Sequence, residues 1–192
     1  MSGVTNIMIA GVGGQGTILA GRIISLLALK AGQEVKVSEV HGMSQRGGSV
    51  LTQVRYGAEV HSPIIDPGTV DILLAFEKLE ALRMLPLLKP QGRAVVNTQE
   101  LPPLPVLSGA MPYPEDAEQR LLAANAQIIL LDAYALALKA GNPKAVNTVL
   151  LGKLSQSLEF SREAWRQAIA EAVKPQFLEL NLRAFDLGCD AA

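Results

Sequence analysis

The sequence has a single cysteine, Cys189, close to its C-terminus. One cysteine excludes an intrachain disulfide, and it excludes a zinc site or an iron–sulfur cluster held by cysteines of this chain alone. Scarce cysteine is typical of proteins of the reducing cytoplasm, which we expect as the compartment. We expect Cys189 itself to be an exposed thiol in the C-terminal tail.

Aromatic and charged residues are also few, at 4% and 18% of the 192 residues, and the net charge is −1. A near-neutral chain without a basic cluster lacks both the charge and the stacking rings that nucleic acids require. The apolar runs at 23–29 and 128–138 are too short to span a membrane, and the first residues lack a signal-peptide pattern. We therefore expect a soluble protein with no nucleic-acid or membrane partner.

Apolar residues are abundant, at 49%, and the length suits one domain, residues 1–192. Strand-length apolar segments alternate with helix-length segments, which predicts an α/β fold. We expect a Rossmann-like, mainly parallel sheet with helices on both faces, an added β-hairpin and a helical C-terminal third. The expected strands are 5–10, 34–38, 49–56, 70–76, 93–97 and 127–131, and the hairpin joins 49–56 to 59–64 around Gly57.

Several single residues predict helix ends and packing. Asp132 and Ser161 are expected N-caps of helices. Gly21 lies inside the first helix, where its cost of about 1 kcal/mol against alanine is explained by close packing on the sheet. Trp165 is expected in the core or at an interface and not in a ligand platform, and Asn147 is expected to satisfy a neighbouring loop.

The first candidate site is the glycine-rich loop GVGGQG, which follows a predicted strand and precedes a predicted helix. Glycines let a ligand approach the backbone, and the N–H groups at a helix start favour a phosphate. In a dinucleotide-binding fold Glu39 would bind a ribose. The alternative is a tight turn without a ligand. The candidate cofactor-binding residues are Gly11, Gly13, Gly14, Gln15 and Gly16.

The second candidate site is the polar loop in SEVHGMSQRGG, residues 38–48, which follows the second predicted strand. Loops at the carboxyl edge of a parallel sheet form the ligand crevice, so this loop is expected beside the first one. Arg46 can pair with a phosphate or carboxylate in a bidentate manner. The alternative is a docking loop for a partner chain. The candidate residues are Met43, Ser44, Gln45, Arg46 and Gly47.

The remaining titratable residues indicate no catalytic centre. His41 and His61 are the only histidines, and neither belongs to a recognisable nucleophile or metal motif. We therefore assign no catalytic residue and no metal ligand to this chain.

Taken together, GVGGQG and SEVHGMSQRGGSV resemble the gamma subunits or gamma domains of 2-oxoacid:ferredoxin oxidoreductases. The resemblance extends along nearly the whole chain, and HGMSQRGG and FLELNLRAFDLG are most similar to the small (beta) subunits of the indolepyruvate branch. The alternatives are a gamma subunit of the pyruvate or 2-oxoglutarate branch and a free-standing NAD-dependent oxidoreductase.

The resemblance implies a complex that oxidatively decarboxylates a 2-oxoacid, such as an aryl pyruvate, and passes electrons to ferredoxin and the acyl group to coenzyme A. It implies that thiamine diphosphate, magnesium and the [4Fe–4S] clusters belong to a large (alpha) partner subunit. This chain would be inactive alone. It would hold coenzyme A on its two loops, or serve only as a scaffold on which those loops dock.

The partner of the chain is therefore expected to be the large subunit, with ferredoxin reached through the complex. Five of the 11 prolines lie between Pro102 and Pro114, and this irregular segment is expected at the surface or at an interface. An isolated chain is expected to expose apolar patches, with a homodimer as its simplest assembly.

Overall fold

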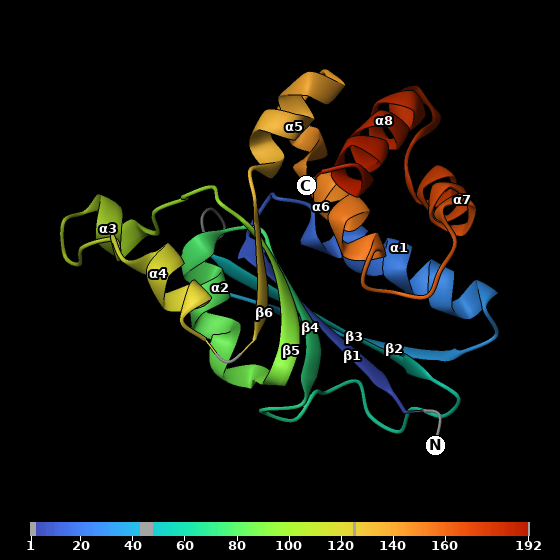
Figure 1. Ribbon diagram of the computed structural model, residues 1–192, viewed down its shortest axis with the longest axis horizontal. Coiled ribbons are helices and arrows are strands. Elements are labelled where there is room, and N and C mark those ends of the chain that lie inside the picture. Colours follow the sequence, from blue (N-terminus) through green and yellow to red (C-terminus); the bar gives the residue numbers. More distant parts are fainter. Residues whose placement is uncertain (1–2, 43–47, 125, 192) are drawn as a thin grey trace.

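A six-stranded sheet forms the centre of the protein (Figure 1), whose computed structural model describes residues 3–42, 48–124 and 126–191. The strands are β1 (Thr5–Val12), β2 (Glu34–His41), β3 (Ser49–Gly57), β4 (Val70–Ala75), β5 (Leu88–Asn97) and β6 (Gln127–Leu131). Their order is β2-β3-β1-β4-β5-β6. Strands β1, β4, β5 and β6 pair in parallel, whereas β3 is antiparallel to both β1 and β2. The predicted, mainly parallel α/β sheet is confirmed.

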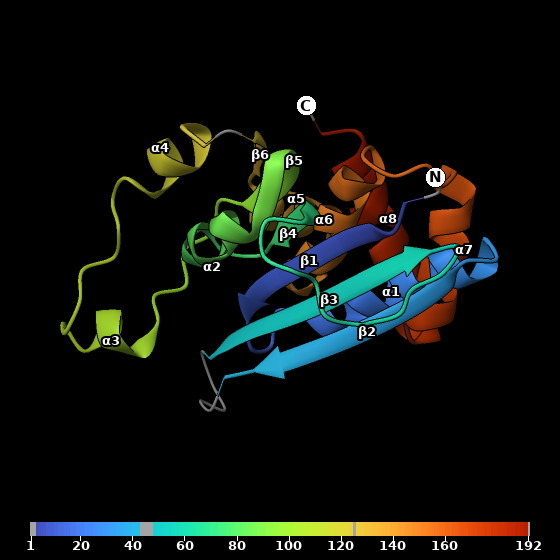
Figure 2. The same cartoon turned by 90° about the horizontal axis from the view of Figure 1, so that it is seen from below.

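Helices cover both faces of this sheet, as predicted (Figures 1 and 2). One face carries α1 (Thr17–Lys30), α5 (Ala133–Ala140), α6 (Val146–Ser155), α7 (Arg162–Ala172) and α8 (Leu178–Cys189). The other carries α2 (Lys78–Met84) and α4 (Ala117–Leu122). The short α3 (Leu104–Leu107) stands away from the sheet, and 3-10 turns are formed by Leu85–Leu87, Pro143–Ala145 and Pro175–Phe177. No helix among the described residues is long and apolar enough to cross a membrane.

The larger of two apolar clusters lies between the sheet and the C-terminal helices. Trp165 is completely buried there, and its ring stacks on Phe185 with the ring centroids 5.8 Å apart. Burying rings of this size supplies much of the apolar driving force that fixes α7 and α8 against each other. Of the two positions expected for Trp165, the core and an interface, the structure shows the core.

The predicted hairpin partner of β3 is wrong. Residues 59–64 form no strand, and β3 instead pairs with β2 from Val50 to Gly57. Because β1 occupies the other edge of β3, no edge is left for a further strand. The guanidinium of Arg55 donates to the carbonyls of Ser62 and Ile64, at 2.9 and 2.8 Å, and Pro63 has no N–H to offer a ladder.

Two helices begin at the N-cap residues that the sequence predicts. Asp132 accepts a hydrogen bond from the Ala135 N–H (2.9 Å) and Ser161 accepts one from the Ala164 N–H (3.2 Å), which confirms both N-caps. The close packing expected at Gly21 is also observed, because a Cβ there would lie 2.8 Å from Cγ2 of Thr52 on β3.

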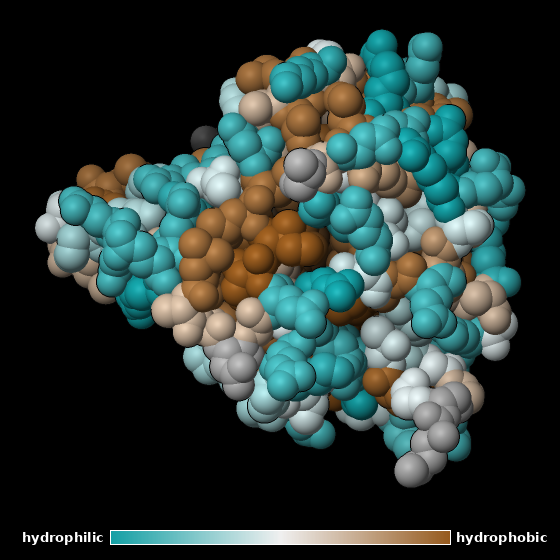
Figure 3. Space-filling model, viewed as in Figure 1, coloured by the Kyte–Doolittle hydropathy of each residue, from teal (hydrophilic) through white to brown (hydrophobic). Residues whose placement is uncertain are grey.

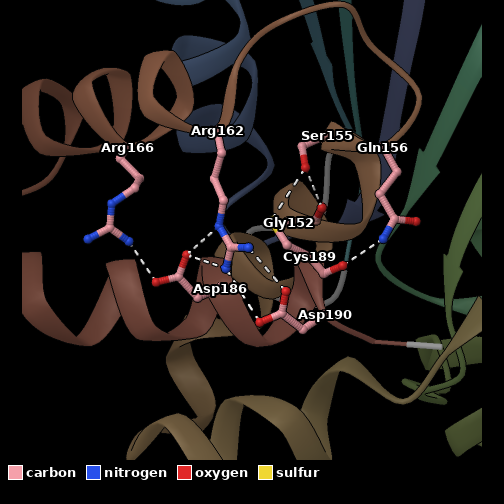
Figure 4. A network of polar contacts seen from close by, with 8 residues as sticks. All are labelled: Gly152, Ser155, Gln156, Arg162, Arg166, Asp186, Cys189 and Asp190. Atoms are coloured by element: carbon pink, nitrogen blue, oxygen red, sulfur yellow. Dashed lines mark hydrogen bonds and ion pairs between the residues drawn. The ribbon is translucent and has the colours of Figure 1, made fainter.

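Helices α6 and α8 cross with their backbones in contact. A Cβ on Gly188 would lie only 2.0 Å from the Val149 carbonyl oxygen, so only glycine permits this approach. Around the crossing, the guanidinium of Arg162 donates to Asp186 and Asp190, and Arg166 donates to Asp186 (Figure 4). These ion pairs fix α7 to the outer side of α8.

The prediction that Cys189 is an exposed tail thiol is wrong. Cys189 is the last residue of α8 and is half-buried, with its Sγ 3.4 Å from the Ser155 hydroxyl (Figure 4). Burial raises the pKa of the Cys189 thiol, which keeps it protonated. The residue therefore belongs to the α6–α8 packing and is not an exposed tail thiol.

Candidate functional site

The two candidate loops leave the sheet at the same place. The Gly13 N–H donates to the Gly48 carbonyl at 2.9 Å, and the Gly42 N–H donates to the Ser49 carbonyl at 2.9 Å. Because β3 is antiparallel to both β1 and β2, it begins where they end, and Gly42 and Gly48, which border the second loop, lie at the edge of the sheet that carries the first loop. The expected proximity of the loops is observed at these bordering residues. The second-loop candidates lie outside the described residues, namely Met43, Ser44, Gln45, Arg46 and Gly47.

The glycine loop ends on Gly16, the N-cap of α1. Gly16 has a left-handed backbone, with φ of +87°, and a Cβ there would lie 2.7 Å from Nδ2 of Asn147 on α6. A side chain at this position would be strained and would also displace Asn147. Asn147 therefore packs directly against the neighbouring glycine loop, in agreement with the position expected for it.

Gln15 holds the loop in shape. Its Oε1 accepts from the Val12 N–H at 2.7 Å, and its Nε2 donates to the Phe76 carbonyl at 3.1 Å, just beyond β4. A Cβ on Gly11 would lie 2.9 Å from that same Oε1. Gln15 and Gly11 therefore position the loop.

The start of α1 carries an uncompensated positive end. The first N–H groups of a helix have no intrahelical acceptor, and the helix dipole adds to their positive charge. No acidic residue lies in the first turn of α1, and the Gly16 cap contributes no side-chain oxygen. An anion is therefore the ligand that this helix end suits best.

A pocket lies on each side of the glycine loop. One, of about 310 Å³, is lined by the loop glycines, the first turn of α1 and the ends of β2 and β3. The other, of about 390 Å³, lies between the loop, Tyr134 and Lys144. Gly14 lines both pockets, so a ligand bound at the start of α1 has space in two directions.

Lys144 is a site residue that the sequence analysis missed. Its side chain is exposed, and it lines both the 390 Å³ pocket and a third pocket of about 330 Å³, which extends toward Lys174 and Phe177. The available signal was the Asn142-Pro143 pair. Asn142 caps the turn by accepting from the Lys144 N–H at 2.9 Å, which fixes where the lysine emerges. Lys144 brings a cation to the anion-favouring end of α1.

Glu39 does not occupy the position that a dinucleotide site would require. It is on the edge strand β2, and β3 lies between β2 and β1, so it is about 10 Å from the loop-bearing strand. Its carboxylate is 3.3 Å from Nε2 of His41, which lines the 310 Å³ pocket. The inserted strand β3 therefore weakens the interpretation of the chain as an NAD-dependent oxidoreductase.

Another pocket, of about 610 Å³, is at the opposite edge of the sheet. It is lined by Thr5, Tyr56 and Ser157 among others, at the amino ends of the parallel strands. Ligands of open α/β sheets bind at the carboxyl ends, so we place the functional site at the glycine loop. The described residues bring together no group of three side chains able to hold a metal ion.

Comparison with known proteins agrees with the resemblance seen in the sequence. A family model described as pyruvate ferredoxin/flavodoxin oxidoreductase matches residues 6–191. The indolepyruvate oxidoreductase subunit IorB of Pyrococcus horikoshii is 42% identical over 97% of this chain and 95% of its own length. The pyruvate/ketoisovalerate oxidoreductases common subunit gamma of Thermococcus kodakarensis is 25% identical over 91% of this chain and 89% of its own.

Solved structures of similar fold come from the same group of enzymes. The gamma subunit of a keto/oxoacid ferredoxin oxidoreductase from Geobacter sulfurreducens has a TM-score of 0.69 and 27% identity, over 96% of this chain and 95% of that one. The 2-oxoglutarate:ferredoxin oxidoreductase of Magnetococcus marinus, with 2-oxoglutarate, coenzyme A and succinyl-CoA bound, has a TM-score of 0.75 and 23% identity. It covers 98% of this chain but 31% of that one, so the fold also forms part of a longer polypeptide.

Proposed function

The chain belongs to the pyruvate ferredoxin/flavodoxin oxidoreductase family and is a subunit of a 2-oxoacid:ferredoxin oxidoreductase, and from this premise we propose that it is the small subunit of an indolepyruvate:ferredoxin oxidoreductase. The indolepyruvate branch is supported by 42% identity to a subunit of that name, against 25% to a pyruvate/ketoisovalerate gamma subunit. Aryl pyruvates are the substrates proposed for the complex, and the cytoplasm is its proposed compartment.

The redox chemistry is assigned to the large partner subunit. With Cys189 as its single cysteine, this chain lacks the thiolates that an iron–sulfur cluster needs. Thiamine diphosphate, magnesium and [4Fe–4S] clusters are therefore proposed for the partner, which also passes electrons to ferredoxin. The small subunit contributes a binding surface.

That surface is proposed to hold the phosphate groups of coenzyme A. The observation that supports this proposal is the 2.9 Å hydrogen bond from Gly13 to Gly48, which joins the glycine loop at the start of α1 to a residue that borders the second loop. There the free N–H groups of α1 and the ammonium of Lys144 meet pockets of about 310 and 390 Å³. These groups suit a ligand whose anionic phosphates are joined to a long uncharged chain. The uncharged chain can occupy the adjoining pockets.

Titration of coenzyme A into the assembled complex tests this assignment. A Cβ at Gly13 would meet no atom closer than 3.8 Å, so Gly13→Asp adds a negative charge without a steric clash. We expect Gly13→Asp to raise the KM for coenzyme A by at least about tenfold, and Lys144→Ala by about threefold to tenfold. Lys139→Ala, a change of the same type at an exposed residue of α5, is the control and should leave the KM unchanged.

Arg46→Ala extends the same titration to the second loop. If Gly13→Asp, Lys144→Ala and Arg46→Ala all keep the wild-type KM, the coenzyme A assignment is wrong. If they fail to assemble with the large subunit instead, as judged by gel filtration, the loops are docking elements. If they assemble and keep full turnover, this subunit is a scaffold.

A further inference from the structure

The most exposed apolar side chains belong to the segment Leu101–Pro114, which we call the arm. It contains α3 and projects from the body on the side where β1 and β2 end (Figures 1 and 2). Leu104, Leu107 and Met111 are 73%, 70% and 60% exposed. Figure 3 shows a small apolar area at the end of the molecule where α3 lies. Apolar side chains gathered on a projection are typical of a surface that another protein covers.

The composition of the arm distinguishes it from an ordinary surface loop. None of its 14 residues is charged, in a chain with 18% charged residues, and five of them are proline. A loop that stays in water usually carries polar groups, whereas the core of a protein interface is depleted of charge. The prolines restrict the backbone, so less conformational entropy is lost when the arm is bound.

Both ends of the arm are held by one buried carboxylate. Glu77 is 1% exposed, and its Oε1 accepts from the Leu101 N–H at 3.3 Å and from the Tyr113 hydroxyl at 2.5 Å. Its Oε2 caps α2 by accepting from the Glu80 N–H at 2.9 Å. Burial and the adjacent Glu77 carboxylate raise the pKa of Tyr113, so the phenol keeps the proton that it donates.

The next residue, Lys78, also holds the two ends of the arm together. Its ammonium is 2.8 Å from Glu100, just before the arm, and 2.8 Å from Glu118 on α4, just after it. Burial would lower the pKa of Lys78, but hydrogen bonds to these two carboxylates outweigh that effect and raise it. Glu77 and Lys78 therefore fix the two ends of the arm to the body of the protein.

We propose that the arm docks into an apolar groove on the large catalytic subunit of the same oxidoreductase. The proposal rests on the function proposed above, because it requires this chain to work as a subunit. Leu101, the first residue of the arm, lines the 390 Å³ pocket together with Gly14 and Gln15. The arm thus continues directly from the edge that presents the coenzyme A loops.

The position of the arm beside the glycine loop indicates which protein binds it. A subunit that offers coenzyme A to a catalytic centre on another chain must turn its glycine loop toward that chain. A projection from the same edge then meets the catalytic subunit first. Because the arm begins at the pocket that Gly14 lines, a second copy of this chain bound to the arm would compete with the catalytic subunit for the same edge.

Binding of the purified small subunit to its large subunit tests the proposal. The double variant Leu104→Ser/Leu107→Ser removes two exposed anchors, and a thermal melt should show unchanged folding because neither side chain is buried. We expect its Kd for the large subunit to rise by at least about tenfold. Leu29→Ser, at a 56% exposed leucine near the end of α1, is the matched control and should bind as wild type does.

Two results would overturn the proposal. One is a wild-type Kd for the double variant. The other is a double variant that changes the isolated chain from dimer to monomer in analytical ultracentrifugation while its Kd for the large subunit is unaltered, because the arm would then join two copies of this chain.

Cross-linking within the assembled complex supplies a second, independent measurement. Ser108 is exposed on the arm, so Ser108→Cys labelled with a photoactivated benzophenone should cross-link to the large subunit. Glu59→Cys, at a side chain that is 74% exposed in the loop after β3, is the control and should give no such product. No cross-link from position 108, or a cross-link to a second small subunit, would argue against the docking site.

These measurements are separable from the coenzyme A assignment. Both use complex formation as their readout and need no turnover. If the coenzyme A titration fails while the Leu104→Ser/Leu107→Ser variant still binds weakly, the docking site stands and only the ligand assignment falls.

Discussion

At the scale of single residues, the site depends on positions where a side chain is not tolerated. Gly16 combines a φ of +87° with the close approach of Asn147, whose Nδ2 would lie 2.7 Å from a Cβ at this position. Gly13, three residues earlier, has no positive φ and open space around it. Two glycines of one motif therefore have different roles: one shapes the loop, and the other keeps its surface open.

This difference gives a stability prediction. Gly16→Ala should lower the free energy of unfolding by about 2 kcal/mol, because a left-handed backbone costs a side-chain-bearing residue about 1–2 kcal/mol and Asn147 must also move. Gly13→Ala should change it by less than about 0.5 kcal/mol. Urea denaturation of the isolated chain measures both. Equal losses in the two variants would show that the loop does not have the conformation described above.

The sequence predicted the glycine loop because its signal is local. A strand, a run of glycines and a helix start are all adjacent in the chain. Lys144 was not recognised as a neighbour of this loop, and Asn147 was expected beside a loop without a prediction of which one, because these residues reach the start of α1 only through the packing of the C-terminal helices on the sheet. Such contacts depend on long-range packing, which no local pattern records.

At the scale of elements, the ion pairs of Asp186 join α7 to α8. Asp186 lies 2.8 Å from Arg162 and 2.6 Å from Arg166. Burial alone would raise the pKa of Asp186, but the hydrogen bonds from the two guanidinium groups outweigh burial and hold it below its ordinary value of 3.8. The carboxylate is therefore stabilised more in the folded chain than in the unfolded one.

The pH dependence of this contribution is testable. Asp186→Asn should cost about 1 kcal/mol of unfolding free energy at pH 7, a value typical of a partly exposed ion-pair network. Because the native pKa is depressed, the contribution of wild-type Asp186 is complete above its ordinary pKa of 3.8 and is lost as the pH falls through the native pKa. Wild type and variant should therefore converge in acid. Urea titrations at a series of pH values from neutral into acid measure this, and a constant difference would contradict it.

The hairpin shows why element pairing is harder to predict than element position. Strands β2 and β3 were both expected, at 34–38 and 49–56, and both are present. Their pairing was missed because the intervening polar segment suggested a long loop, while Gly57-Ala58 suggested a tight turn. In the segment after β3, the guanidinium of Arg55 donates to the carbonyls of Ser62 and Ile64. These carbonyls are therefore hydrogen-bonded without pairing to a neighbouring strand.

At the scale of the whole molecule, this chain is proposed to bind coenzyme A, and its large partner subunit is proposed to carry out the redox chemistry. Its candidate site offers backbone N–H groups and Lys144, but within the described residues neither an electron carrier nor a nucleophile paired with a base. We expect the isolated chain to show no viologen reduction with indolepyruvate and coenzyme A, and we expect activity when the large subunit is added. The large subunit alone is the control. Turnover by the small chain alone would refute the proposed assignment of the chemistry.

Both described ends of the polypeptide lie far from the glycine loop. Thr5 and Ser157 line the same pocket at the amino ends of the strands, and Gln156, next to Ser157, donates to the Cys189 carbonyl at 2.6 Å (Figure 4). A polypeptide fused at either end would thus begin near the amino ends of the parallel strands and would leave the glycine loop at their carboxyl ends uncovered. Gene fusion is sterically undemanding for this architecture, consistent with the same fold occupying 31% of the longer Magnetococcus marinus chain.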